Sequence, residues 1–179
     1  MRLKEKYNKE ILPALKEKLG VKNIFLAPKM LQVSINVGLG KTTKEKEYLD
    51  NVANSLTLLS GQHPVFTKAK KSVSAFKIRE GQTIGAKVTL RGDRMYDFVE
   101  RLVNIVFPRV RDFRGISDKS IDRQGNMTIG FKDNLPFPEI HLEDASNVHG
   151  LEITIVTSAK TKEAGLELFK LLGFPFKKN

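Results

Sequence analysis

The sequence contains no cysteine and no tryptophan, and acidic residues are in the minority. Without cysteine, disulfides, thiolate metal sites and thiol nucleophiles are excluded. No run approaches the 18 apolar residues of a membrane-spanning helix, and the charged start Met1–Lys6 lacks the apolar stretch of a signal peptide. We therefore expect a soluble protein of the cytoplasm.

The excess of basic residues indicates a polyanionic partner. Lys and Arg total 31 against 20 Asp and Glu, which gives a net charge of +11 over 179 residues. Nucleic acid and anionic membranes are the usual partners of such proteins. Apolar residues make up 40% of the chain, enough for a hydrophobic core. The length and the absence of a linker predict a single domain over residues 1–179.

Hydrophobic periodicity predicts an α+β fold. Period-four spacing indicates helices over 3–19, with a kink at Pro13 and a stop at Gly20, over 42–59, over 93–106 and over 161–172. A capping box of Thr42 and Glu45, an Asp93 cap and a stop at Pro108 fit these helices. Period-two alternation indicates strands over 31–37, 127–131 and 151–155 and a hairpin over 64–91 with its tip near Arg79–Gln82. We expect a mostly antiparallel sheet with helices packed on one face, which leaves the other face for a ligand.

Charge is segregated along the chain. Seven basic residues and one acid, Glu80, lie in the hairpin; a second basic cluster is in the loop Arg109–Arg114; and residues 133–159 contain acids but no Lys or Arg. A run of charge is often only a solvated surface. Here the basic residues lie on strands and loops among Thr, Ser and Gln, which favours contacts with phosphates and riboses. The acidic stretch would repel a phosphate backbone, so it faces solvent or a basic protein.

Folded RNA is the favoured ligand. The sequence has no helix-turn-helix, zinc-finger or basic-zipper pattern. With no Trp and three Tyr, single-strand binding through aromatic stacking is disfavoured.

Motifs for catalysis are incomplete. Gly38–Thr42 lies between a strand and a helix, as a phosphate-binding loop does, but Ile35 stands where that motif needs glycine. Lys41 is therefore interpreted as an RNA phosphate contact. His141 and His149, with Glu139 and Asp144 nearby, match no zinc spacing and are interpreted as surface or interface residues. We predict no enzyme, no metal and no cofactor. A nucleotide-dependent enzyme using Gly40, Lys41 and Thr42 and a general nucleic-acid chaperone remain as alternatives.

Several sequence blocks together resemble one family. They are Leu31–Gly40, Gly61–Pro64 with Thr67–Ser72, Phe76–Gly81, Ile84–Gly92, Arg109–Gly115 and Leu171–Phe176. In this order, over essentially the whole chain, they are similar to the bacterial-type 5S-rRNA-binding proteins of the large ribosomal subunit, the large-subunit protein five family. The resemblance implies a structural protein of the central protuberance that attaches 5S rRNA, approaches P-site tRNA and touches a basic head protein of the small subunit.

The resemblance also implies roles for individual residues. Contacts to 5S rRNA fall on Asn36, Gly38, Gly40, Gln62, Thr67, Lys68, Lys70, Lys71, Lys87, Thr89 and Arg91. Further rRNA contacts fall on Lys41, Arg109, Arg111 and Arg114. The tRNA contact falls on the hairpin tip, Lys77, Arg79, Glu80, Gly81 and Gln82. The small-subunit protein and other proteins of the central protuberance are the expected protein partners, with Glu139, His141, Glu143 and Asp144 facing the former.

Structural roles compete with some of these assignments. Gly38, Gly40 and Gly81 can serve turns that need positive φ. Thr67 and Thr89 can be simple strand formers. Asp112 can pair with Arg111 or Arg114 and so shape its loop.

Overall fold

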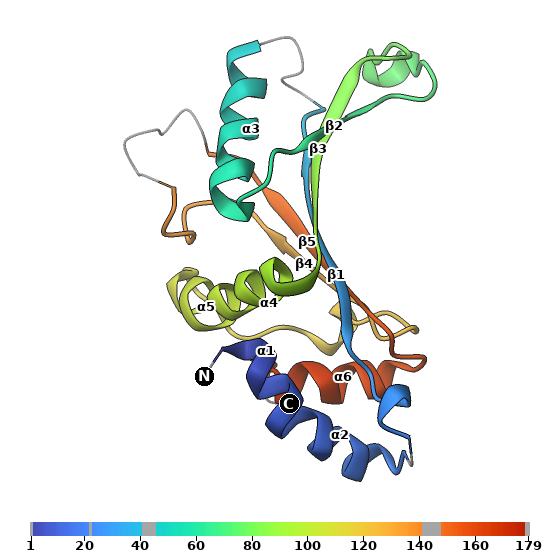
Figure 1. The fold of residues 1–179 in the computed structure, drawn as a ribbon. Coiled ribbons are helices and arrows are strands. Elements are labelled where there is room, and N and C mark those ends of the chain that lie inside the picture. Colours follow the sequence, from blue (N-terminus) through green and yellow to red (C-terminus); the bar gives the residue numbers. More distant parts are fainter. Residues whose placement is uncertain (1, 22, 41–45, 141–147, 178–179) are drawn as a thin grey trace. The chain divides into compact units, whose positions relative to one another are not determined.

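The structure is a computed structural model that describes residues 2–21, 23–40, 46–140 and 148–177 (Figure 1). The chain forms two compact units. Unit 1 comprises residues 1–33, 90–129 and 153–179, and unit 2 comprises residues 34–89 and 130–152.

Five strands form one sheet in the order β2-β3-β1-β5-β4, and they contribute residues to both units. Their bounds are β1 Met30–Gly38, β2 Val65–Lys68, β3 Thr83–Leu90, β4 Met127–Phe131 and β5 Leu151–Thr157. β2 and β3 pair antiparallel. The amide of Leu39, after β1, donates to Ile84 at the start of β3, as an antiparallel pair requires. The predicted α+β class with an antiparallel sheet is confirmed.

The N-terminal helix of unit 1 changes its winding ahead of proline. It runs as α1 (Leu3–Lys6), a π-helical turn (Tyr7–Ile11) and α2 (Leu12–Leu19). Pro13 lies in the first turn of α2, directly after the wider π turn. Because Pro has no N–H and its ring crowds the preceding turn, a wider turn accommodates it. The helix ends at Gly20, which adopts φ of 63° as predicted.

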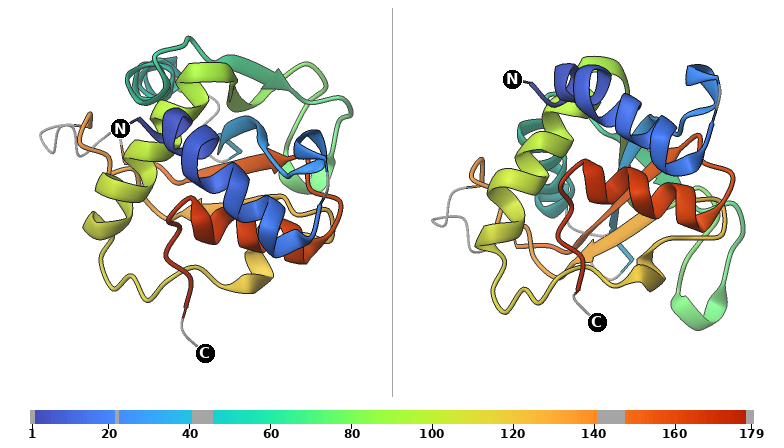
Figure 2. Two further views of the ribbon diagram at one scale, coloured as in Figure 1. Left: turned by 60° about the horizontal axis from the view of Figure 1, so that its bottom comes forward. Right: turned by 90° about the horizontal axis from the view of Figure 1, so that it is seen from below.

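The C-terminal helix α6 (Lys162–Leu171) lies beside α2 in all three ribbon views (Figures 1 and 2). Lys18 of α2 and Glu167 of α6 form an ion pair of 2.9 Å. The predicted start of α6 is confirmed, since the Thr161 hydroxyl accepts from the amide of Ala164 at 3.3 Å.

The helix after β3 departs from the sequence prediction at both ends. It comprises α4 (Gly92–Arg101), a π turn (Leu102–Val106) and α5 (Phe107–Arg109). Arg91 occupies the N-cap, and Asp93 instead lies in the first turn and pairs with Lys4 of α1. Pro108 does not stop the helix at once, since the helix continues to Arg109; Pro108 follows the wider π turn, as Pro13 does.

Unit 2 packs one helix, α3 (Lys46–Ser60), against its strands. Val52, Leu56 and Leu59 of α3 are buried to about 1% exposure or less, as are Ile35 and Val37 of β1. Gly61, with φ of 67°, follows the helix. The predicted capping box at Thr42 and Glu45 lies outside the described residues. In the described part of the chain, no helix has both the length and the apolar character needed to cross a membrane.

Candidate nucleic-acid interface

The strands of unit 2 present one apolar and one polar face. On β1, Val33, Ile35 and Val37 are buried, whereas Asn36 and Gly38 are exposed. On β3, Ala86 and Val88 are buried, whereas Lys87 is exposed. Side chains alternate between faces along a strand, so the polar positions face away from the core. We call this surface the strand face, and it comprises Asn36, Gly38, Thr67, Gly85, Lys87 and Thr89.

At Gly85, residues of the three strands β1, β2 and β3 lie close together. A Cβ at Gly85 would lie 2.8 Å from Thr67 Oγ1 of β2, 3.1 Å from the Val37 carbonyl oxygen of β1 and 3.9 Å from Asn36 Oδ1. Thr67 and Gly85 are also direct partners in the β2–β3 register. The predicted contacts Asn36 and Thr67 therefore converge on one spot, an amide beside a hydroxyl. Sequence reasoning did not select Gly85, although glycine inside a strand signals close approach of another backbone.

Local hydrogen bonds fix the turn that follows α3. Ser60 Oγ lies 2.6 Å from the carbonyl oxygen of Leu56, to which its single proton can be donated, and 2.9 Å from that of Gln62; it accepts from the Gln62 amide at 3.2 Å. These bonds fix the backbone of Gln62, a predicted rRNA contact, where the chain turns from α3 toward β2.

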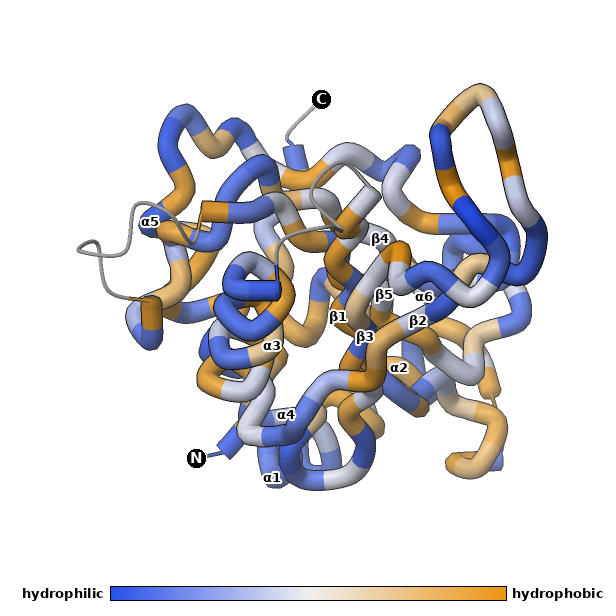
Figure 3. Tube along the Cα trace, turned by 90° about the horizontal axis from the view of Figure 1, so that it is seen from above, coloured by the Kyte–Doolittle hydropathy of each residue, from blue (hydrophilic) through white to orange (hydrophobic). Residues whose placement is uncertain are grey.

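Residues 69–82, which we call the basic loop, connect β2 to β3 and extend beyond them (Figure 1). At its base, the Ala69 amide donates to Gln82 O at 2.8 Å and the Gly81 amide donates to Ala69 O at 3.0 Å. Farther out, Val73 and Ile78 form an isolated bridge around the turn Ser74–Phe76. The loop therefore has an internal hydrogen-bond frame, and Figure 3 shows hydrophilic and hydrophobic segments alternating along it.

The predicted position of the hairpin tip is wrong. Ser74–Lys77 forms the tip, closed by a bond from the Lys77 amide to Ser74 O at 3.0 Å, and Lys77 adopts a left-handed φ of 54°. Arg79–Gln82 instead makes a second turn nearer the base, with Gln82 N donating to Arg79 O at 3.2 Å. The fourteen residues of the basic loop contain two turns, and Gly81 lies in the inner one.

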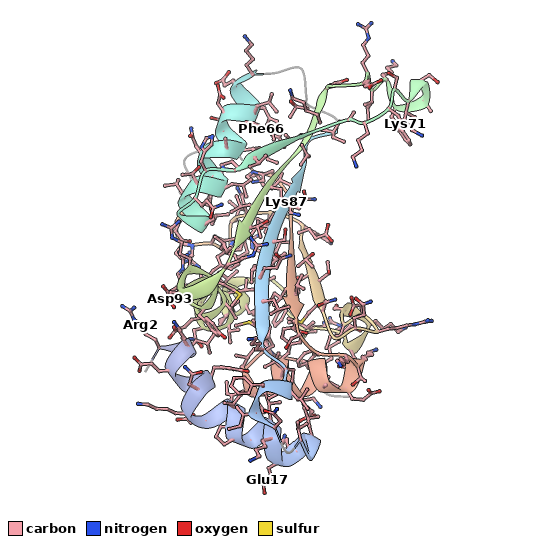
Figure 4. All side chains as sticks on the ribbon, turned by 45° about the vertical axis from the view of Figure 1, so that its right-hand side comes forward. Arg2, Glu17, Phe66, Lys71, Lys87 and Asp93 are labelled. Carbon is pink, nitrogen blue, oxygen red and sulfur yellow. The ribbon has the colours of Figure 1, made fainter. Side chains whose placement is uncertain are left out.

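Cations and one aromatic side chain project from the basic loop and its entry. Lys68, Lys70, Lys71, Lys77 and Arg79 are all exposed. Figure 4 places Lys71 on the loop and Lys87 on β3, so that both the loop and the strand face carry positive charge. Phe76 is 74% exposed at the tip. The sequence reasoning discounted aromatic contacts from Trp and Tyr and did not weigh the 11 Phe residues.

The structure tests whether turns that need positive φ explain the glycines among the predicted contacts. Gly81 has φ of 80° and is needed for its turn. Gly38 and Gly40 are not among the glycines with positive φ, and no described atom would lie within 4 Å of a Cβ on either. A turn requirement therefore does not explain them. Lys41 lies outside the described residues.

The four arginines predicted to contact rRNA belong to unit 1. Arg91 Nη2 donates to Gln32 Oε1 at 2.6 Å, so the Arg91 side chain lies on the polar side of β1. Arg109, Arg111 and Arg114 are exposed. Among the described ion pairs, none joins Asp112 to Arg111 or Arg114. Asp112 instead shapes the loop through a left-handed φ of 53°, and Phe113 stacks on Phe107 at 5.1 Å between centroids.

The acidic stretch is only partly described. Glu139 is half-buried in a turn-rich segment, and the predicted contacts His141, Glu143 and Asp144 lie outside the described residues. His149 is not a surface residue: it is 5% exposed, and its Nδ1 lies 3.2 Å from Nδ2 of buried Asn134. Within the described ranges, no cluster of three or more His, Asp or Glu could hold a metal ion.

Comparisons with known proteins bear on the whole chain. Residues 23–79 match the family model described as ribosomal protein L5, and residues 83–176 match the model for the C-terminus of the same ribosomal family. Full-length relatives are also similar. The chain is 54% identical over 177 residues to large ribosomal subunit protein uL5 of Desulforamulus reducens, covering 99% of this chain and 98% of the relative.

Two further relatives carry the same name. The uL5 protein of Lacticaseibacillus casei is 52% identical and that of Streptococcus thermophilus is 51% identical, each over 177 residues with 99% of this chain and 98% of the relative covered. The matched segments include the strands of the strand face, the basic loop and the arginine-rich loop.

Proposed function

From the fact that this chain belongs to the ribosomal protein L5 family, we propose that it binds 5S rRNA through the strand face and the base of the basic loop. The chain is a structural constituent of the large ribosomal subunit, acts in translation, and has rRNA and ribosomal proteins as partners. Members of this family are structural constituents and not enzymes, which agrees with the prediction from the incomplete catalytic motifs. The proposal adds which RNA is bound and where.

The convergence at Gly85 is the observation that carries this proposal. It sets the Asn36 amide and the Thr67 hydroxyl near each other on a surface that includes the exposed Lys87 and has no carboxylate among its members. Amides and hydroxyls bond to riboses and base edges, and a cation beside them neutralises phosphate. A preformed polar sheet face suits a folded RNA, which is read by shape and 2′-hydroxyl contacts.

The lysines at the entry of the basic loop supply the electrostatic part of the binding. Lys68, Lys70 and Lys71 are exposed and adjoin the strand face along the chain. Each phosphate contact contributes about −0.7 to −0.9 to the slope of log affinity against log salt. Replacing all three by Ala should therefore weaken 5S rRNA binding and flatten this slope by about one unit per lost contact.

A matched variant tests whether position or charge alone matters. Lys6, Lys9 and Lys16 are also exposed, on the N-terminal helix of unit 1, and their replacement by Ala removes the same charge. Filter binding of labelled 5S rRNA at several salt concentrations compares the two triple variants. Equal flattening of the slope in both would remove the entry lysines from the interface.

The tip and the inner turn of the basic loop are proposed to contact P-site tRNA. They carry the exposed Lys77 and Arg79, respectively, and both lie beyond the pairing of β2 with β3. The acidic stretch that begins near Glu139 is proposed to face a basic protein of the small subunit, because opposite charges favour that association.

The arginine-rich loop at Arg109–Arg114 is proposed as an additional rRNA contact.

A further inference from the structure

An exposed apolar turn in unit 1 lies outside every surface assigned above. Ile24, Phe25 and Leu26 form a single 3₁₀ turn between α2 and β1 and are 50%, 92% and 65% exposed. Scattered exposed apolar residues need no explanation, but three consecutive ones form a patch, and such patches mark interaction sites. Phe25 presents nearly its whole ring to solvent.

Hydrogen bonds hold this turn in one shape. The Asn23 side-chain oxygen accepts from the Phe25 amide at 2.9 Å, and the Asn23 carbonyl accepts from the Leu26 amide at 3.1 Å. Its exit is anchored at Pro28, whose carbonyl oxygen accepts from the buried Tyr7 hydroxyl at 3.1 Å. Because the ring is presented on a fixed backbone, a ligand that docks on it loses little conformational entropy.

The surroundings of the turn carry positive charge. The sequence has no acidic residue between Glu17 and Glu45, and Lys29 directly after the turn is exposed. Lys29 N donates to Ser158 Oγ at 3.0 Å and Ser158 N donates to Lys29 O at 2.9 Å. This pairing brings a second cationic segment, which contains Lys160, next to the turn.

A shallow polar depression adjoins Ser158. Its volume is about 350 Å³, and it is lined by Gln124, Asn126, Val156, Thr157, Ala159 and Lys160. The nearby carboxylate of Asp122 is already engaged, because it accepts from the amides of Gln124 and Asn126 and from Asn126 Nδ2. The Asn126 amide and the Thr157 hydroxyl of its lining are likewise bonded within the protein, so Lys160 is the cation that this depression presents to a ligand.

We propose that the Ile24–Leu26 turn is a stacking platform for an unpaired base of large-subunit rRNA, with Lys29 and Lys160 neutralising the phosphates beside it. Unpaired RNA bases stack on exposed aromatic rings, and basic residues track the adjoining backbone. An apolar protein surface would also cover Phe25, but it would leave the exposed Lys29 and Lys160 without partners. This platform is separate from the strand face and does not depend on the proposed 5S rRNA contact.

The absence of tryptophan gives a direct test. Phe25→Trp introduces the only tryptophan of the chain, and Leu58→Trp introduces one at a 59%-exposed position on α3 as the control. A single-stranded oligoadenylate and a fully paired RNA hairpin are titrated into each variant. We expect saturable quenching of Phe25→Trp by the oligoadenylate only, with little change in Leu58→Trp. Equal quenching of both variants, or none in Phe25→Trp, overturns the proposal.

Competition measures the contribution of the ring. At a salt concentration where the oligoadenylate leaves Leu58→Trp unchanged, the unmodified protein should reverse the quenching of Phe25→Trp. Phe25→Ala and Phe25→Leu should compete about 5- to 150-fold less well, as expected for the loss of one stacked base. Phe25 is almost fully exposed, so neither change threatens folding. If Phe25→Leu competes as well as the unmodified protein, apolar area and not stacking is what matters, and a protein ligand replaces RNA.

Discussion

Gly85 shows how one residue controls the geometry of the strand face. The missing side chain lets Thr67 approach Asn36 and the β1 backbone. Thr67 can rotate away from an added Cβ, but the Val37 carbonyl, at 3.1 Å, belongs to a central strand and cannot move by itself. We expect Gly85→Ala to lower the free energy of unfolding by about 1–3 kcal/mol and to weaken 5S rRNA binding, as measured by urea denaturation and filter binding.

Gly130 provides the matched control for that prediction. It lies on β4, its φ is not positive, and no described atom would lie within 4 Å of an added Cβ. Gly130→Ala should change the stability by less than about 1 kcal/mol, in the stabilising direction, because it restricts the unfolded chain. Equal losses in both variants would mean that close approach at Gly85 is not the cause.

Tyr7 links the N-terminal helix to the exit of the Ile24–Leu26 turn. Burial raises the pKa of its hydroxyl to about 12, and the hydroxyl donates to Pro28 O at 3.1 Å. Tyr7→Phe should lower the free energy of unfolding by about 1–3 kcal/mol at pH 7, because the Pro28 carbonyl loses its partner. Urea denaturation measures this loss, with Tyr48→Phe as the control.

The pKa of Tyr7 also sets a pH dependence. Because the folded pKa is higher than the ordinary value of 10.0, the stabilisation is complete below pH 10 and is lost as the pH rises toward 12. The free energy of unfolding of the Tyr7→Phe variant should therefore fall less steeply as the pH rises over this range. Burial raises the pKa of Tyr96 as well, so part of the alkaline loss should remain. An unchanged pH profile would show that the pKa of Tyr7 is the same in the folded and unfolded states.

At the scale of elements, sequence patterns located the helices and strands but not their irregularities. Pro13 and Pro108 predicted a break, yet in both places the helix continues after a π turn. The periodicity of apolar residues is nearly the same for α and π turns over five residues, so it cannot distinguish them. The tip of the basic loop was missed for a related reason, since Lys77 takes a left-handed φ that glycine usually signals.

The division of labour between the basic loop and the strand face gives a prediction for Arg79. This exposed residue lies on the inner turn of the loop, with its amide bonded to Gln82 Oε1 at 3.1 Å. Arg79→Ala keeps that backbone bond and removes only the guanidinium. We expect unchanged 5S rRNA affinity and weaker retention of P-site tRNA in reconstituted ribosomes, measured by filter binding of each RNA. A collapse of 5S rRNA binding would contradict the proposed division.

At the scale of the whole molecule, the net charge alone did not identify a site. Alternation along β1 and β3 predicted which polar residues share a face, because period two is a property of any strand. It could not predict that Thr67 and Asn36 would both lie near Gly85, since that arrangement depends on the β2–β3 register and on the space at Gly85. The exposure of Phe25 was equally hidden, because an apolar residue between a helix and a strand is usually buried.

The same distinction between charge and geometry decides how the protein should select RNA. A net charge of +11 attracts any RNA at low salt, and this component falls steeply as salt rises. Contacts from Asn36 and Thr67 are short-range and uncharged, so they should persist at higher salt and favour a matching shape. We therefore expect labelled 5S rRNA to stay bound against excess tRNA and excess scrambled RNA at the higher of two salt concentrations in a filter-binding competition. Displacement by both competitors would mean that charge alone drives binding, and a general nucleic-acid chaperone would then describe the isolated protein better.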